Sequence, residues 1–174
     1  MFDPRGTQTL FRTLSRNHYN LLKMVDNKAS IILTINSIII SLIMGAMYVA
    51  PETEKMAIMT GAKILRIFSM LSMIFAVISM LPHRYLGKKF KDSGYKGTLY
   101  ADNFATKSIE DFRKEFERIM SSGEQVYDEM INDLYFLGVV ISRKQRMIWF
   151  STIIFLIGLI ATAIVSIGQG LNVL

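Results

Sequence analysis

Long uncharged apolar runs alternate with charged stretches along this chain. A helix needs about 20 apolar residues to cross a hydrocarbon core of ~30 Å, because it rises ~1.5 Å per residue. Residues 29–50 and 147–167 meet this requirement and contain no charged side chain. Residues 64–81 are shorter and contain Arg66 near one end, from where its side chain can reach the headgroups. The pattern predicts three transmembrane helices, with a re-entrant or surface helix as the alternative for the middle one.

Apolar spacing also predicts that the first and third spans continue as helices beyond the membrane. No proline stands between Pro4 and Pro51, or between Glu124 and Ile167. Before the first span, apolar residues together with His18 recur at intervals of three or four positions: Phe11, Leu14, His18, Leu21 and Val25. A similar series precedes the third span: Tyr127, Met130, Ile131, Leu134, Leu137 and Ile141. We expect one long helix to lead into each of these two spans.

The segment between the second and third spans has the pattern of a small helical region. Lys88–Gly97 is basic and contains glycine, which predicts a loop. Ser108, with Asp111 three residues later, resembles a capping box and predicts a helix over Ile109–Met120. Residues 121–123 (Ser-Ser-Gly) predict a break before the last long helix. The predicted fold is an all-α membrane protein with about three transmembrane helices and long helices extending into a helical cytoplasmic domain.

Basic residues gather on one side of the three spans. They precede the first span, follow the second and precede the third: Arg5, Arg12, Arg16, Lys23, Lys28; Arg84, Lys88, Lys89, Lys91, Lys96; Arg143, Lys144, Arg146. Because positively charged segments stay in the cytoplasm, the N-terminus is expected inside. The predicted regions are a cytoplasmic amphipathic helix (1–28), a transmembrane hairpin (29–82, with spans 29–50 and 64–81), a cytoplasmic helical region (83–146), a third span (147–167) and a short outer tail (168–174).

The composition and the motifs argue against an enzyme. The chain carries a net charge of +6 and contains no cysteine and only two histidines, which excludes a disulfide scaffold, a cysteine nucleophile and a histidine-based metal cluster. No phosphate-binding glycine loop and no hydrolase or kinase motif is present. Eight acidic residues between 110 and 133 stand in charge-mixed helical runs, which are typical of solvated faces. We therefore expect neither catalysis nor a cofactor.

The first span carries a stripe of small polar residues: Ser30, Thr34, Ser37 and Ser41, extended by Gly45. Such a stripe either packs helices closely through hydrogen bonds or lines a water-filled path in an oligomer. Asn36 beside it favours a pore-facing role, because an amide at mid-bilayer needs a partner or water. Ile40 and Ile43 could form an apolar gate. The candidate pore or gate residues are Asn36, Ser37, Ile40, Ser41 and Ile43.

Basic, aromatic and amide side chains outside the spans form a candidate site for a phosphate-bearing ligand. Arginine and lysine pair with phosphate, and tyrosine or histidine stacks on a base. The alternative is a basic surface that only sets topology or touches anionic lipid. The candidate ligand-binding residues are Arg12, Arg16, Asn17, His18, Tyr19, Lys23, Tyr135, Arg143 and Lys144.

Three runs resemble the transmembrane effectors of the Pycsar family of bacterial antiphage defence: Leu14–Ile43, Tyr100–Phe112 and Tyr127–Ile148. The matching pieces are Leu14-Ser15-Arg16-Asn17-His18, Asp26-x-Lys28-Ala29, Asn36, Asn103-Phe104 and Asp133-x-Tyr135-Phe136-Leu137-Gly138. Some members carry an additional phosphohydrolase-like domain with His-Asp motifs. This chain does not contain those motifs, so the resemblance implies no hydrolytic activity.

The resemblance implies an inner-membrane effector that answers a nucleotide signal from a neighbouring cyclase or nucleotidyltransferase. In Pycsar systems the signal is a cyclic pyrimidine mononucleotide, and similar effectors such as Hailong look to be channels controlled by other nucleotide or short nucleic-acid signals. The leading hypothesis is a homo-oligomeric channel or permeabiliser that stops growth of the infected cell. The alternative is a non-conducting membrane anchor that recruits a soluble partner. The sequence leaves open the signal, its sign of control, the oligomer number and the ion preference.

Overall fold

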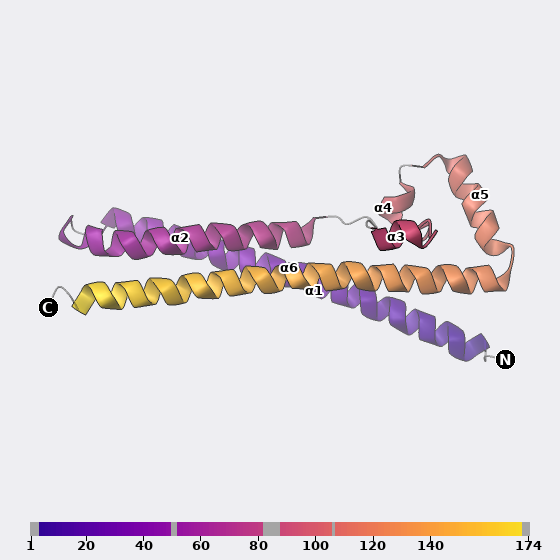
Figure 1. Ribbon diagram of the computed structural model, residues 1–174, viewed down its shortest axis with the longest axis horizontal. Coiled ribbons are helices and arrows are strands. Elements are labelled where there is room, and N and C mark those ends of the chain that lie inside the picture. Colours follow the sequence, from indigo (N-terminus) through magenta and orange to yellow (C-terminus); the bar gives the residue numbers. More distant parts are fainter. Residues whose placement is uncertain (1–3, 50–51, 82–87, 106, 172–174) are drawn as a thin grey trace. The chain divides into compact units, whose positions relative to one another are not determined.

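The computed structural model describes residues 4–49, 52–81, 88–105 and 107–171, and the part of the chain in these ranges is helical, without a strand (Figure 1). The elements are α1 (Pro4–Val49), α2 (Glu52–Met80), α3 (Lys88–Asp92), α4 (Ala101–Phe104), α5 (Ile109–Met120) and α6 (Gly123–Leu171). Three helices are long and apolar enough to cross a membrane, over Arg5–Val49, Met59–Met80 and Gly123–Gln169. The predicted all-α fold with three such helices is confirmed.

Two compact units make up the chain. The membrane unit consists of Val25–Met80 and Lys144–Leu174, and the head unit consists of Met1–Met24 and Leu81–Arg143. Both α1 and α6 contribute residues to each unit without a break in the helix, as the absence of proline led us to expect. The three C-terminal residues of the expected outer tail, 172–174, lie outside the described residues.

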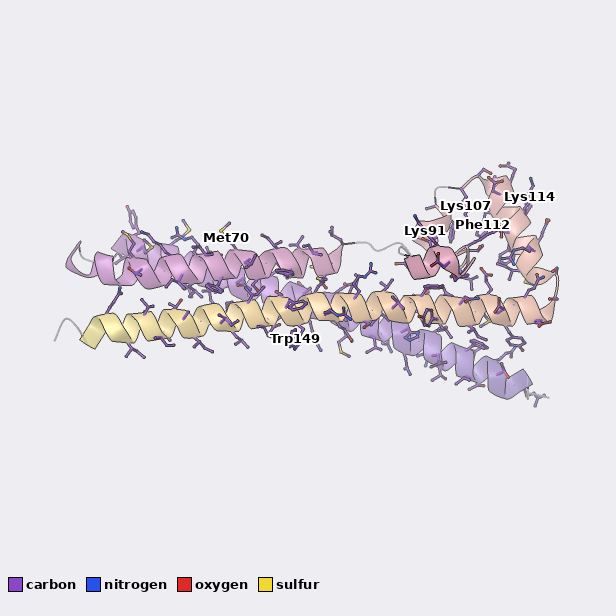
Figure 2. The ribbon with its side chains drawn as sticks, viewed as in Figure 1. Met70, Lys91, Lys107, Phe112, Lys114 and Trp149 are labelled. Atoms are coloured by element: carbon purple, nitrogen blue, oxygen red, sulfur yellow. The ribbon has the colours of Figure 1, made fainter. Side chains whose placement is uncertain are left out.

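Small side chains hold the three helices of the membrane unit together. The inward face of α2 follows a 3-4-3-4-3 spacing of buried residues: Ala62, Leu65, Ser69, Ser72, Ala76 and Ser79. Helices in lipid gain no hydrophobic energy from associating, so close backbone approach through small residues provides the packing. Larger apolar side chains point away, as Met70 on α2 and Trp149 on α6 do (Figure 2). This spacing can be read from the sequence, but we based a prediction only on the Ser/Thr stripe of the first span.

An aromatic and aliphatic core organises the head unit. Tyr95, Phe136, Leu137, Val140 and Ile141 are buried together. The Tyr95 ring stacks on Phe136 with centroids 5.5 Å apart, and Phe90 meets Phe136 edge-on at 5.1 Å. Since the Phe90 ring is anchored in this way, the residues around it form α3. The expectation of a loop throughout Lys88–Gly97 is therefore wrong for its first half.

The capping prediction for α5 is confirmed. The helix covers Ile109–Met120, and the Ser108 hydroxyl accepts a hydrogen bond from the backbone N–H of Asp111 at 3.1 Å. A turn before α4 depends on Gly97, which has a φ of 64° and lies against the Asn103 side chain. A residue with a Cβ would meet both a strained backbone and a filled space there.

Candidate functional site

The polar centre of the membrane unit joins all three of its long helices. Asn36 on α1 is 0% exposed and donates from Nδ2 to Ser72 Oγ on α2 at 3.3 Å. Ser72 Oγ lies 3.0 Å from Ser151 Oγ on α6, and Ser151 donates to the Ser72 carbonyl at 2.7 Å. Asn36 therefore lies inside the three-helix unit, where hydrogen bonds connect its amide to both neighbouring helices.

The other candidate pore residues divide between two faces of α1. Ser37 and Ser41 are exposed, together with the rest of the Ser/Thr stripe. Ile40 and Ile43 are half-buried, on the same side of the helix as Asn36. The inward face of α1 continues the spacing of Phe11, His18 and Val25 through Ala29, Ile32 and Asn36, which is the signal that could have placed Asn36 inside from the sequence.

An ion pair between a buried lysine and a partly exposed aspartate links α1 and α6 near the boundary of the membrane unit. Lys144 is 5% exposed, and its Nζ donates to Asp26 Oδ1 at 2.9 Å. The Lys144 carbonyl accepts a hydrogen bond from Ser79 Oγ at 3.4 Å, which brings α2 to the same place. The candidate ligand residue Lys144 thus has a partner inside the protein. The sequence did not reveal this partner, because the two residues are 118 positions apart.

The candidate ligand residues of α1 form an exposed face of the head unit. Arg12, Arg16, Tyr19 and Lys23 follow a 4-3-4 spacing and are all exposed, with Asn17 beside them. In the described part of the chain no carboxylate pairs with these three basic side chains. Their charges are available to an anionic ligand or to anionic lipid.

The remaining candidate ligand residues of the head unit differ in their exposure. His18 is half-buried, and its Nε2 lies 3.7 Å from where a Cβ on Gly138 would stand. Its Nδ1 is buried without a hydrogen-bond partner among the described residues. Tyr135 and Arg143 on α6 are exposed. The described residues contain no group of three or more acidic or histidine side chains arranged for a metal ion.

Ion pairs fix α5 against α6 within the head unit. Arg118 donates from Nε to Glu115 at 3.0 Å and from Nη2 to Glu129 at 3.2 Å, and Lys96 also pairs with Glu115. The hydrogen bond from Lys96 holds the pKa of Glu115 below its ordinary value, and the hydrogen bond to Glu115 raises the pKa of Arg118. Glu129 is buried, so the eight acidic residues of 110–133 are not a uniformly solvated face as expected from the sequence.

This network predicts an acid-sensitive α5. The pKa of Glu115 in the folded chain lies below its value of 4.5 in an unfolded chain, so its contribution to stability is present above that value and is lost as the pH falls through the lowered pKa. Hydrogen exchange of the α5 amides, corrected for intrinsic rates, should accelerate over this window. Glu115→Gln should show the faster exchange already at neutral pH, whereas Glu117→Gln, an exposed change on the same helix, should not. Equal protection in both variants would contradict the prediction.

The comparisons with known proteins identify the family of the chain. The family model described as "Pycsar effector protein domain" matches residues 9–169, almost the whole chain. No curated protein and no solved structure matches the chain. The match covers all three runs on which the resemblance was based, and it includes the polar centre, the Lys144–Asp26 ion pair and the basic face of α1. The chain therefore belongs to the Pycsar effector family.

Proposed function

We propose that this chain is a homo-oligomeric inner-membrane channel or permeabiliser, controlled by a nucleotide or oligonucleotide signal, that arrests growth of the infected cell. Family membership assigns it to bacterial antiphage defence, and its three long apolar helices indicate a membrane location. The proposal adds four properties to this assignment: channel activity, oligomerisation, control by a signal and a cytoplasmic N-terminus. It assigns the chain no catalytic role.

The observation that carries the proposal is the continuity of α1 and α6. Each helix contains head-unit residues and membrane-unit residues without a proline, a turn or another break between them. A ligand that changes the tilt or rotation of such a helix at one end changes its packing at the other. Binding energy at the head unit would then bias two packing states of the spans, which is what ligand-controlled opening requires.

Exposed surface on the membrane unit supports assembly of several copies. The Ser/Thr stripe of α1 is exposed along its whole length in one chain. Small polar residues on a lipid-facing helix allow a second helix to approach closely and to share hydrogen bonds. A closed ring of identical copies would use this stripe at each interface.

Ion conductance measured with the purified chain in planar bilayers tests the proposal. We expect current that changes when cyclic UMP or cyclic CMP is added on the head-unit side, with cyclic AMP as the comparison. A short oligonucleotide serves as the second class of signal. Zero conductance in the absence and in the presence of every one of these compounds would reject the channel.

Charge reversal on the basic face of α1 should weaken binding of the signal. Arg12→Glu and Arg16→Glu each remove a charge-assisted contact to phosphate, worth ~1.5–3 kcal/mol, so calorimetry should show at least about a tenfold loss of affinity. Lys114→Glu on α5 is the matched control, since Lys114 is also an exposed cation of the head unit (Figure 2). If both α1 variants bind the nucleotide as tightly as the control does, this face serves topology or lipid contact only.

The adaptor alternative has one observation in its favour. The α5 helix exposes Ile109, Phe116 and Met120, which together form an apolar surface outside the spans. A partner that covers this surface would make the chain a membrane anchor. Deleting residues 109–121 should then abolish antiphage protection while Asn36→Leu leaves it intact. The channel proposal expects Asn36→Leu to change the current or the toxicity at unchanged expression.

A further inference from the structure

The inward face of α2 is a row of mostly small side chains that runs from Ser79 to Ala62. At one end Ser79 hydrogen-bonds the Lys144 carbonyl, and Lys144 reaches Asp26. The row then passes Ala76 and Ser72 and continues beyond Ser69. Leu65, which is buried, is its one large side chain. The row therefore places three buried serine hydroxyls inside the three-helix unit.

Two buried polar groups, one on this row and one on the inward face of α1, have no protein partner among the described residues. Asn36 Oδ1 and Ser69 Oγ are both buried and unpaired, and each residue is 0% exposed. A lone serine in a membrane helix can hydrogen-bond the carbonyl four residues earlier, as Thr34 and Thr152 do with Ser30 and Ile148. Ser69 does not, so its hydroxyl stays available to a molecule inside the unit. Buried groups of this kind are normally satisfied by water.

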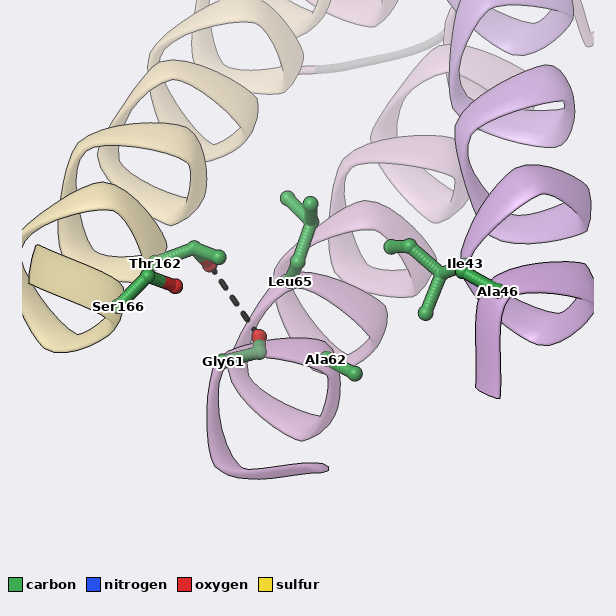
Figure 3. A pocket seen from close by; sticks show the side chains of 7 residues that line it. All are labelled: Ile43, Ala46, Gly61, Ala62, Leu65, Thr162 and Ser166. Carbon is green, nitrogen blue, oxygen red and sulfur yellow. Dashed lines mark hydrogen bonds between the residues drawn. The ribbon is translucent and has the colours of Figure 1, made fainter. Parts of the chain in front are cut away.

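A cavity of about 180 Å³ opens at the far end of the same row (Figure 3). It is lined by Ile43 and Ala46 of α1, Gly61, Ala62 and Leu65 of α2, and Thr162 and Ser166 of α6. Thr162 donates a hydrogen bond to the Gly61 carbonyl at 3.4 Å across this space. The cavity is large enough for several waters, since one water occupies ~30 Å³ in the liquid. Leu65 belongs to its lining and also precedes Ser69 on the inward face of α2.

We propose that water occupies this internal row and that the permeation path runs inside each protomer, between α1, α2 and α6. The inference rests on the proposed channel function and gives it a location. Waters bind Asn36 Oδ1 and Ser69 Oγ, the cavity at Gly61 is one mouth, and the Asp26–Lys144 pair stands at the other. Leu65 closes the path in the described state, because an apolar constriction excludes water until the helices separate.

The exposed Ser/Thr stripe then has a packing role between copies. Its residues are exposed, Thr34 donates to the Ser30 carbonyl within α1, and Ser37 Oγ donates to Met73 Sδ on α2 at 4.0 Å. No polar atom of the stripe is both buried and unpaired among the described residues. The two locations for the path, inside one protomer or between protomers, thus involve different faces of α1 and are separable by experiment.

Single-cysteine variants test the location, because the chain contains no cysteine of its own. Ser69→Cys and Ser72→Cys probe the internal row, Ser37→Cys and Ser41→Cys probe the stripe, and Ile38→Cys probes the lipid-facing surface. The full-length variants are placed in liposomes and treated with a small, charged, membrane-impermeant thiol reagent, with and without cyclic UMP or cyclic CMP. Conductance is recorded on the same samples.

We expect Ser69→Cys and Ser72→Cys to react several-fold faster than Ile38→Cys and to lose most of their current on modification. Leu65→Ser should raise the basal leak, because it removes the apolar side chain that closes the path. Current that is blocked only at Ser37→Cys or Ser41→Cys would overturn the inference and leave the channel intact. If no variant conducts, the channel proposal fails, and reactivity alone decides whether the internal row is hydrated. Reaction at Ser69→Cys supports hydration. Reaction rates at Ser69→Cys and Ser72→Cys as low as the rate of Ile38→Cys refute it.

Discussion

Asp26→Leu is expected to destabilise the membrane unit by about 1–3 kcal/mol, the cost of leaving the buried Lys144 ammonium without the carboxylate of Asp26, whose side chain is 40% exposed. The Lys144 ammonium is almost inaccessible to solvent and has Asp26 as its carboxylate partner at 2.9 Å. With leucine at position 26 the cation must either stay buried and unpaired or leave its place between the helices. Thermal or denaturant unfolding of the purified chain in detergent measures the loss.

A double variant separates this explanation from a simple packing defect. Asp26→Leu combined with Lys144→Met removes both charges. The combination should recover most of the lost stability, because the buried cation that lacked a partner is replaced by an apolar side chain of similar size. Arg143→Leu, an exposed cation next to Lys144 in the chain, should change stability little. If the double variant is no more stable than Asp26→Leu alone, the ion pair is not the reason for the loss.

Gly158→Leu is expected to prevent close packing of α2 on α6. A Cβ added at Gly158 would overlap the first side-chain carbon of Phe68 and come within 2.9 Å of its ring. The larger leucine must push the helices apart, and overpacking of this kind costs ~1–3 kcal/mol or more. Separation would also stretch the Ser72–Ser151 hydrogen bonds, which join the same two helices. We expect a lower unfolding midpoint and increased exposure of α2 to protease.

The same helix provides the control. Gly168 also lies on α6, and a Cβ there would meet nothing within 4 Å. Gly168→Leu therefore adds the same side chain with the same helix-favouring effect but without a clash. A stability loss of equal size in both variants would mean that the backbone freedom of glycine, and not the contact with Phe68, explains the result.

Local patterns were sufficient for the three long helices and for α5. Uncharged apolar runs gave three helices able to span a membrane, the absence of proline gave the long α1 and α6, and the Ser108–Asp111 spacing gave the start of α5. The first half of Lys88–Gly97 was misassigned because α3 depends on Phe90, whose contact with Phe136 lies more than forty positions away in the chain.

The candidate sites depended more heavily on tertiary contacts. Asn36 stood out in the sequence as a polar residue within a span, but its direction was decided by Ser72 and Ser151 on two other helices. Lys144 stood out as a cation, and only the fold brought Asp26 to it. The ion pairs of Glu115 and Glu129 with Arg118 likewise turned part of an expected solvated face into a contact between helices.

The sequence by itself determined which segments are helical, which can cross a membrane and to which family the chain belongs, because hydrophobicity, backbone breaks and short motifs are properties of neighbouring residues. Only the tertiary structure decided which face of each helix turns inward. That choice depends on which side chains of distant segments fit together and pair in lipid, where small residues and hydrogen bonds replace the hydrophobic effect as the source of packing energy.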